Sequence, residues 1–85
     1  MSRLIFVMYY VYVLRSISSG HIYKGFCSDL GQRLNEHNAG KTISTSPFIP
    51  WEIAYFVNFE SMDKAIAREK YFKTSAGRRF LKTVL

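Results

Sequence analysis

Apolar and polar positions along the chain divide it into short alternating runs and two stretches of helical spacing. Residues 8–14 are all apolar or tyrosine, which predicts a strand covered on both faces and therefore central in its sheet. Serines and a glycine in residues 15–20 predict a turn, and residues 21–26 predict a second strand that returns as a hairpin. Residues 51–59 alternate and predict a third strand.

The first helix is predicted from its end signals. Asp29 is a favourable N-cap, Gln32 follows at the spacing of a capping box, and Gly40 lies just past the expected end. The helix should therefore run from Leu30 to about Asn38. The serine, threonine and proline content of the next ten residues predicts an irregular loop.

A second helix is predicted to start after Ser61. Helical spacing gives it an inward stripe, and a carboxylate interrupts that stripe: Met62, Ala65, Ile66, Glu69 and Phe72. Gly77 is expected to end this segment before a last short helix over residues 78–85. The elements predict an α+β domain with a small, mainly antiparallel three-stranded sheet flanked by helices.

The length of 85 residues suits one domain over residues 1–85. Met8 is an alternative start, which would make residues 1–7 an N-terminal appendage. The apolar run after Arg3 superficially resembles a secretory signal, but we favour a strand because the run contains three tyrosines and alternates. The single cysteine, Cys27, allows no intramolecular disulfide or cysteine zinc site, which favours a reducing compartment, the cytoplasm.

The charge is strongly positive. Twelve Lys and Arg against six Asp and Glu give a formal net charge of +6, so a polyanion is the natural partner. Residues 64–85 carry seven of the basic side chains and one acid, Glu69. A solvated basic face explains such a stretch equally well. A membrane-surface role is the least favoured, and the apolar run is far shorter than the ~20 residues of a membrane span.

Five polar or titratable side chains occupy positions where apolar residues are expected. We predict a hairpin register that places Tyr12 directly opposite Tyr23 on one face. Arg33 and His37 share the apolar face of the first helix, and Glu69 interrupts the stripe of the second. A core this small tolerates buried polar groups poorly, so their convergence predicts a reaction site.

Each of these side chains also has a structural explanation. Strand tyrosines commonly only pack, and a half-buried arginine can extend to solvent. His37 can be a hydrogen-bonded core histidine, and Glu69 can pair with Arg68, Lys70 or Lys73. These alternatives stay open on the sequence alone.

Taken together, the groups suit phosphodiester hydrolysis. One carboxylate can hold a single Mg²⁺ or Mn²⁺ that also binds the substrate phosphate. A tyrosine hydroxyl or His37 can help deprotonate the attacking water, and Arg33 can stabilise charge on the phosphorus. Serine-nucleophile and zinc chemistry have less support, because the chain has no nucleophile-elbow pattern and only two histidines.

These residues stand within an ordered set of short motifs. The motifs run from residue 8 nearly to the end of the chain, and they are Tyr10-Val11-Tyr12, Tyr23-Lys24-Gly25, Arg33-Leu34, His37-Asn38-Ala39-Gly40-Lys41, Pro50-Trp51, Arg68-Glu69-Lys70 and Gly77-Arg78-Arg79. The set resembles the GIY-YIG nuclease superfamily, and in particular short single-domain members similar to the N-terminal domain of the incision subunit of nucleotide-excision DNA repair.

The resemblance implies one-metal hydrolysis of DNA. It makes Tyr12 and Tyr23 the motif tyrosines, Arg33 the catalytic arginine and Glu69 the metal ligand. It also implies that Gly25 lets backbone approach the site and that His37 belongs to the catalytic cluster. The basic side chains expected to contact DNA are Lys24, Lys41, Lys70, Lys73, Arg78 and Arg79.

The chain departs from the family pattern at several positions. Lys24 replaces the middle isoleucine of the second motif, no asparagine follows Glu69, and residues 44–51 lack the basic side chains usual before Pro-Trp. Two hypotheses follow. The first is a divalent-metal-dependent endonuclease directed by DNA structure or by a protein partner, and the second is a nucleic-acid-binding module with little or no catalysis.

Overall fold

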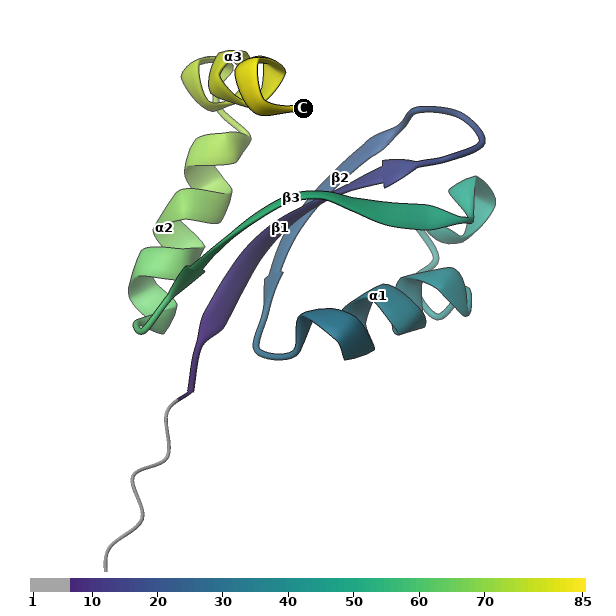
Figure 1. Cartoon of the computed structure of the whole chain (residues 1–85), viewed down its shortest axis with the longest axis horizontal. Coiled ribbons are helices and arrows are strands. Elements are labelled where there is room, and N and C mark those ends of the chain that lie inside the picture. The colour runs from purple at the N-terminus through teal and green to yellow at the C-terminus, as the bar shows by residue number, and fades with distance from the viewer. Residues whose placement is uncertain (1–6) are drawn as a thin grey trace, which may run out of the picture.

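The computed structural model describes residues 7–85 (Figure 1). The expectation that residues 1–7 form an appendage lies outside the described residues, Val7 excepted. In chain order the elements are β1 (Tyr9–Ser16), β2 (Ile22–Cys27), α1 (Leu30–Asn38), the 3₁₀ turn η1 (Ser46–Phe48), β3 (Trp51–Phe59), α2 (Met62–Phe72) and α3 (Ser75–Val84).

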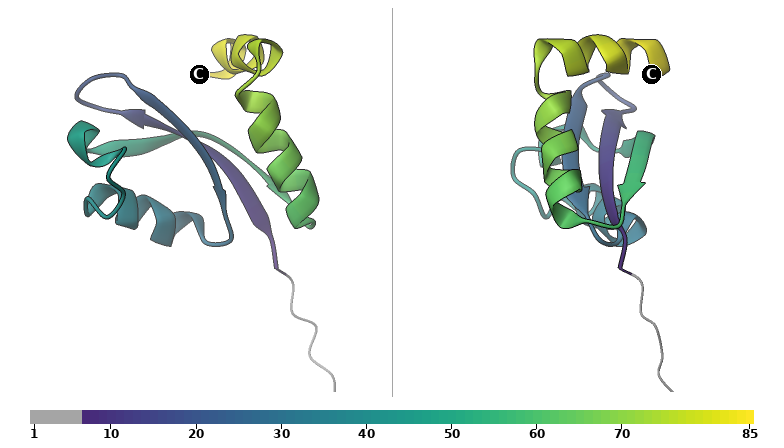
Figure 2. Two further views of the ribbon diagram at one scale, coloured as in Figure 1. Left: turned by 180° about the vertical axis from the view of Figure 1, so that it is seen from behind. Right: turned by 90° about the vertical axis from the view of Figure 1, so that its left-hand side faces the viewer.

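The strands form one antiparallel sheet in the order β2-β1-β3, so the apolar run of β1 is central as predicted. α1 lies on one face of the sheet, and α2 and α3 lie on the other (Figures 1 and 2). This arrangement confirms the α+β prediction. Within residues 7–85, no helix is long and apolar enough to cross a membrane.

The alternation of β1 explains the two cores. Val11 and Val13 are fully buried and pack beneath α2 and α3, against Phe72 among others. Tyr12 and Leu14 point to the opposite face, where α1 covers them. Because β1 is buried on both faces, the polar hydroxyl of Tyr12 is held inside the protein.

The predicted hairpin register is wrong by two residues. Tyr12 pairs with Gly25, and Tyr23 pairs with Leu14. β1 continues to Ser16, whose backbone N–H donates to the carbonyl of His21 at 2.8 Å, so the turn lies later than expected. A shift of two residues keeps every side chain on its face, and the rings of Tyr12 and Tyr23 remain neighbours with centroids 6.3 Å apart.

The predicted helix starts are confirmed at Asp29 and Ser61, which both act as N-caps. The capping box is only half formed, because the Gln32 side chain donates to Glu36 at 3.4 Å. The predicted stripe of α2 is wrong at its first position: Met62 is 46% exposed, since α2 approaches the sheet one turn later, at Ala65.

Gly77 does not interrupt the last helix, contrary to expectation. Thr74 is the N-cap of α3, so Gly77 lies in its first turn. A Cβ at this position would collide with the carbonyl oxygen of Tyr71 and lie 2.7 Å from the Cα of Phe72. The glycine is therefore needed where α3 packs against the end of α2.

Gly77→Ala should destabilise the protein by at least about 1–3 kcal/mol, because the backbone atoms that a methyl group meets have little room to move. Chemical denaturation measures the change. Gly31→Ala is the matched control, since its nearest neighbour would be a side-chain oxygen at 3.9 Å, and it should be neutral or slightly stabilising. Equal effects of the two substitutions would contradict the packing argument.

Candidate active site

A pocket of about 470 Å³ lies at the edge strand β2 and extends onto both faces of the sheet. Tyr12, Tyr23 and Arg33 line it from the side of α1, whereas Glu69 of α2 and Lys73, the C-cap of α2, line it from the opposite side. Side chains from the two faces can meet here because no strand lies beyond β2. The complete lining is Tyr12, Ile22, Tyr23, Lys24, Gly25, Phe26, Arg33, Glu69 and Lys73.

His37 is not part of this lining, although it touches the site through Tyr12. It is 1% exposed, and its Nε2 lies 3.1 Å from the hydroxyl oxygen of Tyr12. Its Nδ1 lies 2.8 Å from Oγ1 of Thr45, which in turn donates to the carbonyl of Thr42 at 3.3 Å. His37 is thus a hydrogen-bonded core histidine that also contacts a pocket tyrosine.

These hydrogen bonds assign the proton positions. The Thr45 hydroxyl gives its proton to the backbone, so it accepts from Nδ1–H of His37. Nε2 then carries no proton and accepts the hydroxyl proton of Tyr12. The chain Tyr12 to His37 to Thr45 therefore leads from the pocket into the interior.

The pKa values of both rings favour neutral groups. Burial, with a smaller contribution from Tyr23, raises the pKa of Tyr12 to about 12, against an opposing effect of Arg33. Burial, assisted by the Arg33 charge, lowers the pKa of His37 below 6.5. At neutral pH, a phenol therefore donates to an imidazole that is free to accept its proton.

Gly25 is the β2 residue opposite Tyr12, and its lack of a side chain shapes the site. A Cβ here would lie 2.6 Å from the hydroxyl oxygen of Tyr12 and 2.7 Å from the ring carbon that carries it. Any larger residue would push the phenol away from His37. The glycine of the second motif thus makes room for the tyrosine of the first.

Arg33 is held at the pocket by its own helix. Its Nε donates to Oε1 of Glu36, one turn along α1, at 3.1 Å. Its side chain is 42% exposed, so the guanidinium keeps donors for a ligand.

Glu69 is the only carboxylate among the described residues that line the pocket. Its side chain is 19% exposed, and Oε1 accepts from Nζ of Lys73 at 3.0 Å. Residues 7–85 contain no group of three or more His, Cys, Asp or Glu side chains that could enclose a metal. A single carboxylate fits a hard divalent cation such as Mg²⁺, which keeps most of its waters and shares the substrate phosphate.

Of the basic side chains predicted to contact DNA, two line the Glu69 pocket and a third lies beside one of these two. Lys24 and Lys73 line the pocket, and Lys24 and Arg78 line an adjoining depression between β2 and α3. Burial, together with the charges of Arg78 and Lys73, lowers the pKa of Lys24. The other three do not line the pocket and are exposed elsewhere: Lys41, Lys70 and Arg79.

Thr45 is the site residue that sequence reasoning missed. It was expected in an irregular loop, yet it is 1% exposed and accepts from His37, while its carbonyl accepts from Nε1 of Trp51 at 2.9 Å. The polar residues of the loop predict a turn, but they do not indicate which hydroxyl, if any, is buried. The loop that lacks basic residues therefore supports His37.

Replacing Thr45 by Val should destabilise the protein by about 1–3 kcal/mol, because Nδ1–H of His37 would be buried without an acceptor. Urea unfolding measures this change. Thr45→Ser keeps the hydroxyl and should therefore lose clearly less stability than Thr45→Val. Val keeps the methyl group of Thr45 and Ser removes it, so a loss of stability in Thr45→Val no larger than that in Thr45→Ser would contradict the hydrogen-bond argument.

Residues 8–81 match the family of the GIY-YIG catalytic domain. The chain belongs to this nuclease family. It is similar to short proteins called UPF0213: it is 38% identical over 65 residues to one from Streptococcus agalactiae serotype V, covering 75% of this chain and 73% of that protein. One from Streptococcus pyogenes serotype M3 is 35% identical over 65 residues, covering 75% and 70%.

A solved structure supports the same relationship. The solution NMR structure of the UPF0213 protein BH0048 from Bacillus halodurans superposes with a TM-score of 0.54 at 25% sequence identity. The superposition covers 89% of this chain and 83% of that chain. The α+β arrangement and the predicted family are thereby confirmed.

Proposed function

We propose that this protein is a divalent-metal-dependent endonuclease that hydrolyses DNA phosphodiester bonds. The observation that carries the proposal is the pocket at β2, where a tyrosine bonded to a neutral histidine, an arginine and one carboxylate meet beside two lysines. Packing alone does not explain why groups from both faces of the sheet line the same pocket. Membership of a nuclease family supports the same chemistry.

Tyr12 activates the attacking water in this proposal. Because its pKa is about 12, Tyr12 accepts a proton only if it gives up its own. As the water proton moves to the phenol oxygen, the phenol proton moves to Nε2 of His37, and the resulting hydroxide attacks phosphorus. The ester P–O bond opposite the attack breaks, and the leaving sugar oxygen takes a proton from solvent. Tyr23, whose ring centroid lies 4.9 Å from that of His37, shapes the wall beside this path.

Arg33 and the lysines act on the phosphate. The guanidinium stabilises the charge that develops on the phosphoryl oxygens, and Lys24 and Lys73 attract the neighbouring phosphates. Glu69 would hold one Mg²⁺ or Mn²⁺, which supplies Lewis-acid stabilisation of the phosphate when bound. With Glu69 engaged in this way, Lys73 would be available to the DNA backbone.

The substrate is expected to be chosen by DNA structure or by a protein partner. The pocket contains few groups suited to reading base edges, and single modules of this size usually gain specificity from more protein. We expect the protein to act in the cytoplasm, where its buried free thiol, Cys27, would stay reduced.

A second candidate is a nucleic-acid-binding module with little catalysis. The ion pair between Glu69 and Lys73 favours it, because the carboxylate is already occupied by a cation of the chain. The two candidates differ in their dependence on metal. A binding module would hold DNA equally well with and without chelator.

A cleavage assay over a panel of labelled DNAs tests the proposal. Blunt duplex, nicked duplex, flapped, branched and single-stranded substrates would be incubated with Mg²⁺, with Mn²⁺ and with EDTA. We expect cutting of at least one structured substrate with either metal and none with EDTA. Binding without cutting under every condition would favour the second candidate.

A further inference from the structure

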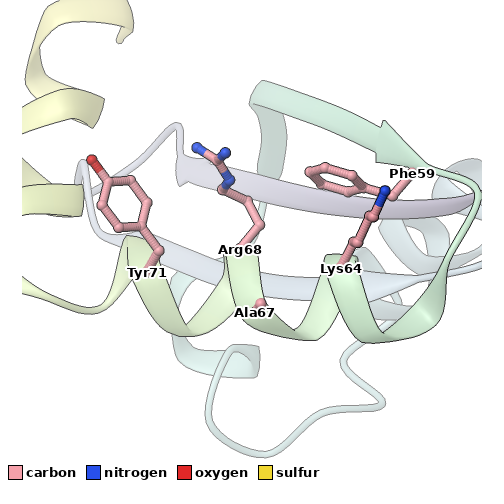
Figure 3. Close-up of a pocket in the computed structure, with 5 residues that line it drawn as sticks. All are labelled: Phe59, Lys64, Ala67, Arg68 and Tyr71. Carbon is pink, nitrogen blue, oxygen red and sulfur yellow. The ribbon is translucent and has the colours of Figure 1, made fainter.

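A second groove, of about 600 Å³, lies on another side of α2 from the Glu69 pocket. Lys64, Arg68 and Tyr71 are spaced by four and three residues, so they share one side of the helix. Figure 3 shows these three side chains in a row, with Phe59 from the end of β3 beside Lys64. Ala67 completes the lining and leaves space between the larger side chains. We call this the α2 groove.

The α2 groove combines aromatic rings with cations. Cζ of Arg68 lies 5.2 Å from the ring centroid of Tyr71 and 6.0 Å from that of Phe72. Among the described residues, those that line the groove include no acid, and neither Lys64 nor Arg68 forms an ion pair. The groove is therefore a positively charged surface lined by two half-buried aromatic rings, and no acidic side chain is among its described lining residues.

This combination matches the chemistry of an unpaired nucleotide. Bases of a single strand stack on aromatic rings, and flanking cations hold the phosphates between them. A base pair in a duplex presents its faces to neighbouring pairs, so a duplex would use only the two cations. An acidic peptide would also be attracted by the charge, but it would make no use of the rings.

We propose that the α2 groove binds unpaired nucleotides of a single-stranded DNA arm. The inference deepens the proposed nuclease function, on which it rests for the position of the cut. The α2 groove and the catalytic pocket lie on different sides of one helix, whose diameter with side chains is about 10–12 Å. A strand that crosses α2 would therefore reach the pocket within a few nucleotides, which selects substrates that carry an unpaired arm.

Binding of an oligothymidine of about 20 nucleotides, long enough to fill a typical single-strand site, tests the groove. Fluorescence anisotropy would be measured in EDTA for the wild type, Tyr71→Leu and Tyr71→Phe, with a blunt duplex in parallel. Loss of the ring should weaken oligothymidine binding about tenfold, whereas Phe keeps the ring and should change it less than about twofold. Duplex binding should change little in both variants.

Arg68→Gln is a second variant, chosen because Arg68 is exposed and its replacement does not threaten folding. It should reduce the slope of log binding constant against log salt by about 0.7, the value of one phosphate contact on a single strand. Tyr71 packs beside the core, so circular dichroism must show that Tyr71→Leu is folded. If that variant is unfolded, the salt slope of Arg68→Gln decides the question.

The inference is overturned if Tyr71→Leu binds oligothymidine like the wild type, or if it weakens duplex binding to the same extent. Competition by polyglutamate as effective as that by oligothymidine would assign the groove to acidic peptides instead. These outcomes are separate from catalysis. If the protein cuts DNA but the groove variants bind oligothymidine like the wild type, the groove proposal is wrong and the nuclease proposal is unaffected. If the groove binds oligothymidine but the protein cuts no DNA, only the nuclease proposal is wrong.

Discussion

Glu69→Gln should lower the rate of DNA cleavage by about a thousandfold or more. Glutamine keeps the size of the side chain but removes the only carboxylate among the described residues that line the pocket. A metal ion at a phosphate supplies several kcal/mol of transition-state stabilisation, and a loss of about 4 kcal/mol corresponds to a thousandfold in rate. Single-turnover cleavage at saturating Mg²⁺ measures the effect.

The same substitution should leave the fold almost unchanged. The ion pair with Lys73 is half exposed on the lysine side, and such pairs contribute at most about 1 kcal/mol. Glu52→Gln is the matched control: Glu52 is an exposed carboxylate that also forms one ion pair, with Arg15, but lies outside the pocket. Cleavage that survives in Glu69→Gln would reject Glu69 as the metal ligand.

Much of the architecture could be predicted because local signals determined it. The unbroken apolar run of β1 requires cover on both faces, and Asp29 and Ser61 provide hydrogen-bond acceptors for the first turns of their helices. The errors arose where contacts between residues in different elements, rather than local signals, determine the structure. The role of Gly77 depends on the carbonyl of Tyr71, and only the packing of α3 on α2 brings the two together.

The site could be predicted as a set of residues but not as a geometry. Helical spacing placed Arg33 and His37 on one side of α1. In the structure His37 forms a hydrogen bond with Tyr12, and Arg33 is close enough to oppose the rise in the pKa of Tyr12. Spacing alone did not predict that His37 would be buried and Arg33 accessible, because the burial of His37 depends on the loop that carries Thr45. Nor could it tell that Glu69 approaches from the opposite face of the sheet, past the edge strand.

Tyr12→Phe should lower cleavage by about a hundredfold to ten-thousandfold, the range that general acid–base groups contribute. It should also destabilise the protein by about 1–3 kcal/mol, because Nε2 of His37 would remain buried without a donor. Tyr23→Phe is the control for removal of a hydroxyl. Within residues 7–85, the Tyr23 hydroxyl forms no hydrogen bond, so this variant should lose little stability.

The pH profile of cleavage distinguishes two roles for Tyr12. If a preformed phenolate were the base, the rate would keep rising toward the pKa of Tyr12, about 12. If His37 takes the phenol proton, the rate should instead rise only through the pKa of His37, which burial holds below 6.5, and then level off. Stability should follow the same imidazole: the unfolded chain binds a proton at His37 more readily, so stability falls as pH drops below about 6.5. A cleavage rate that climbs steadily between neutral pH and pH 10 would contradict transfer to His37. The 3.1 Å hydrogen bond between the Tyr12 hydroxyl and Nε2 of His37 would then have a purely structural role.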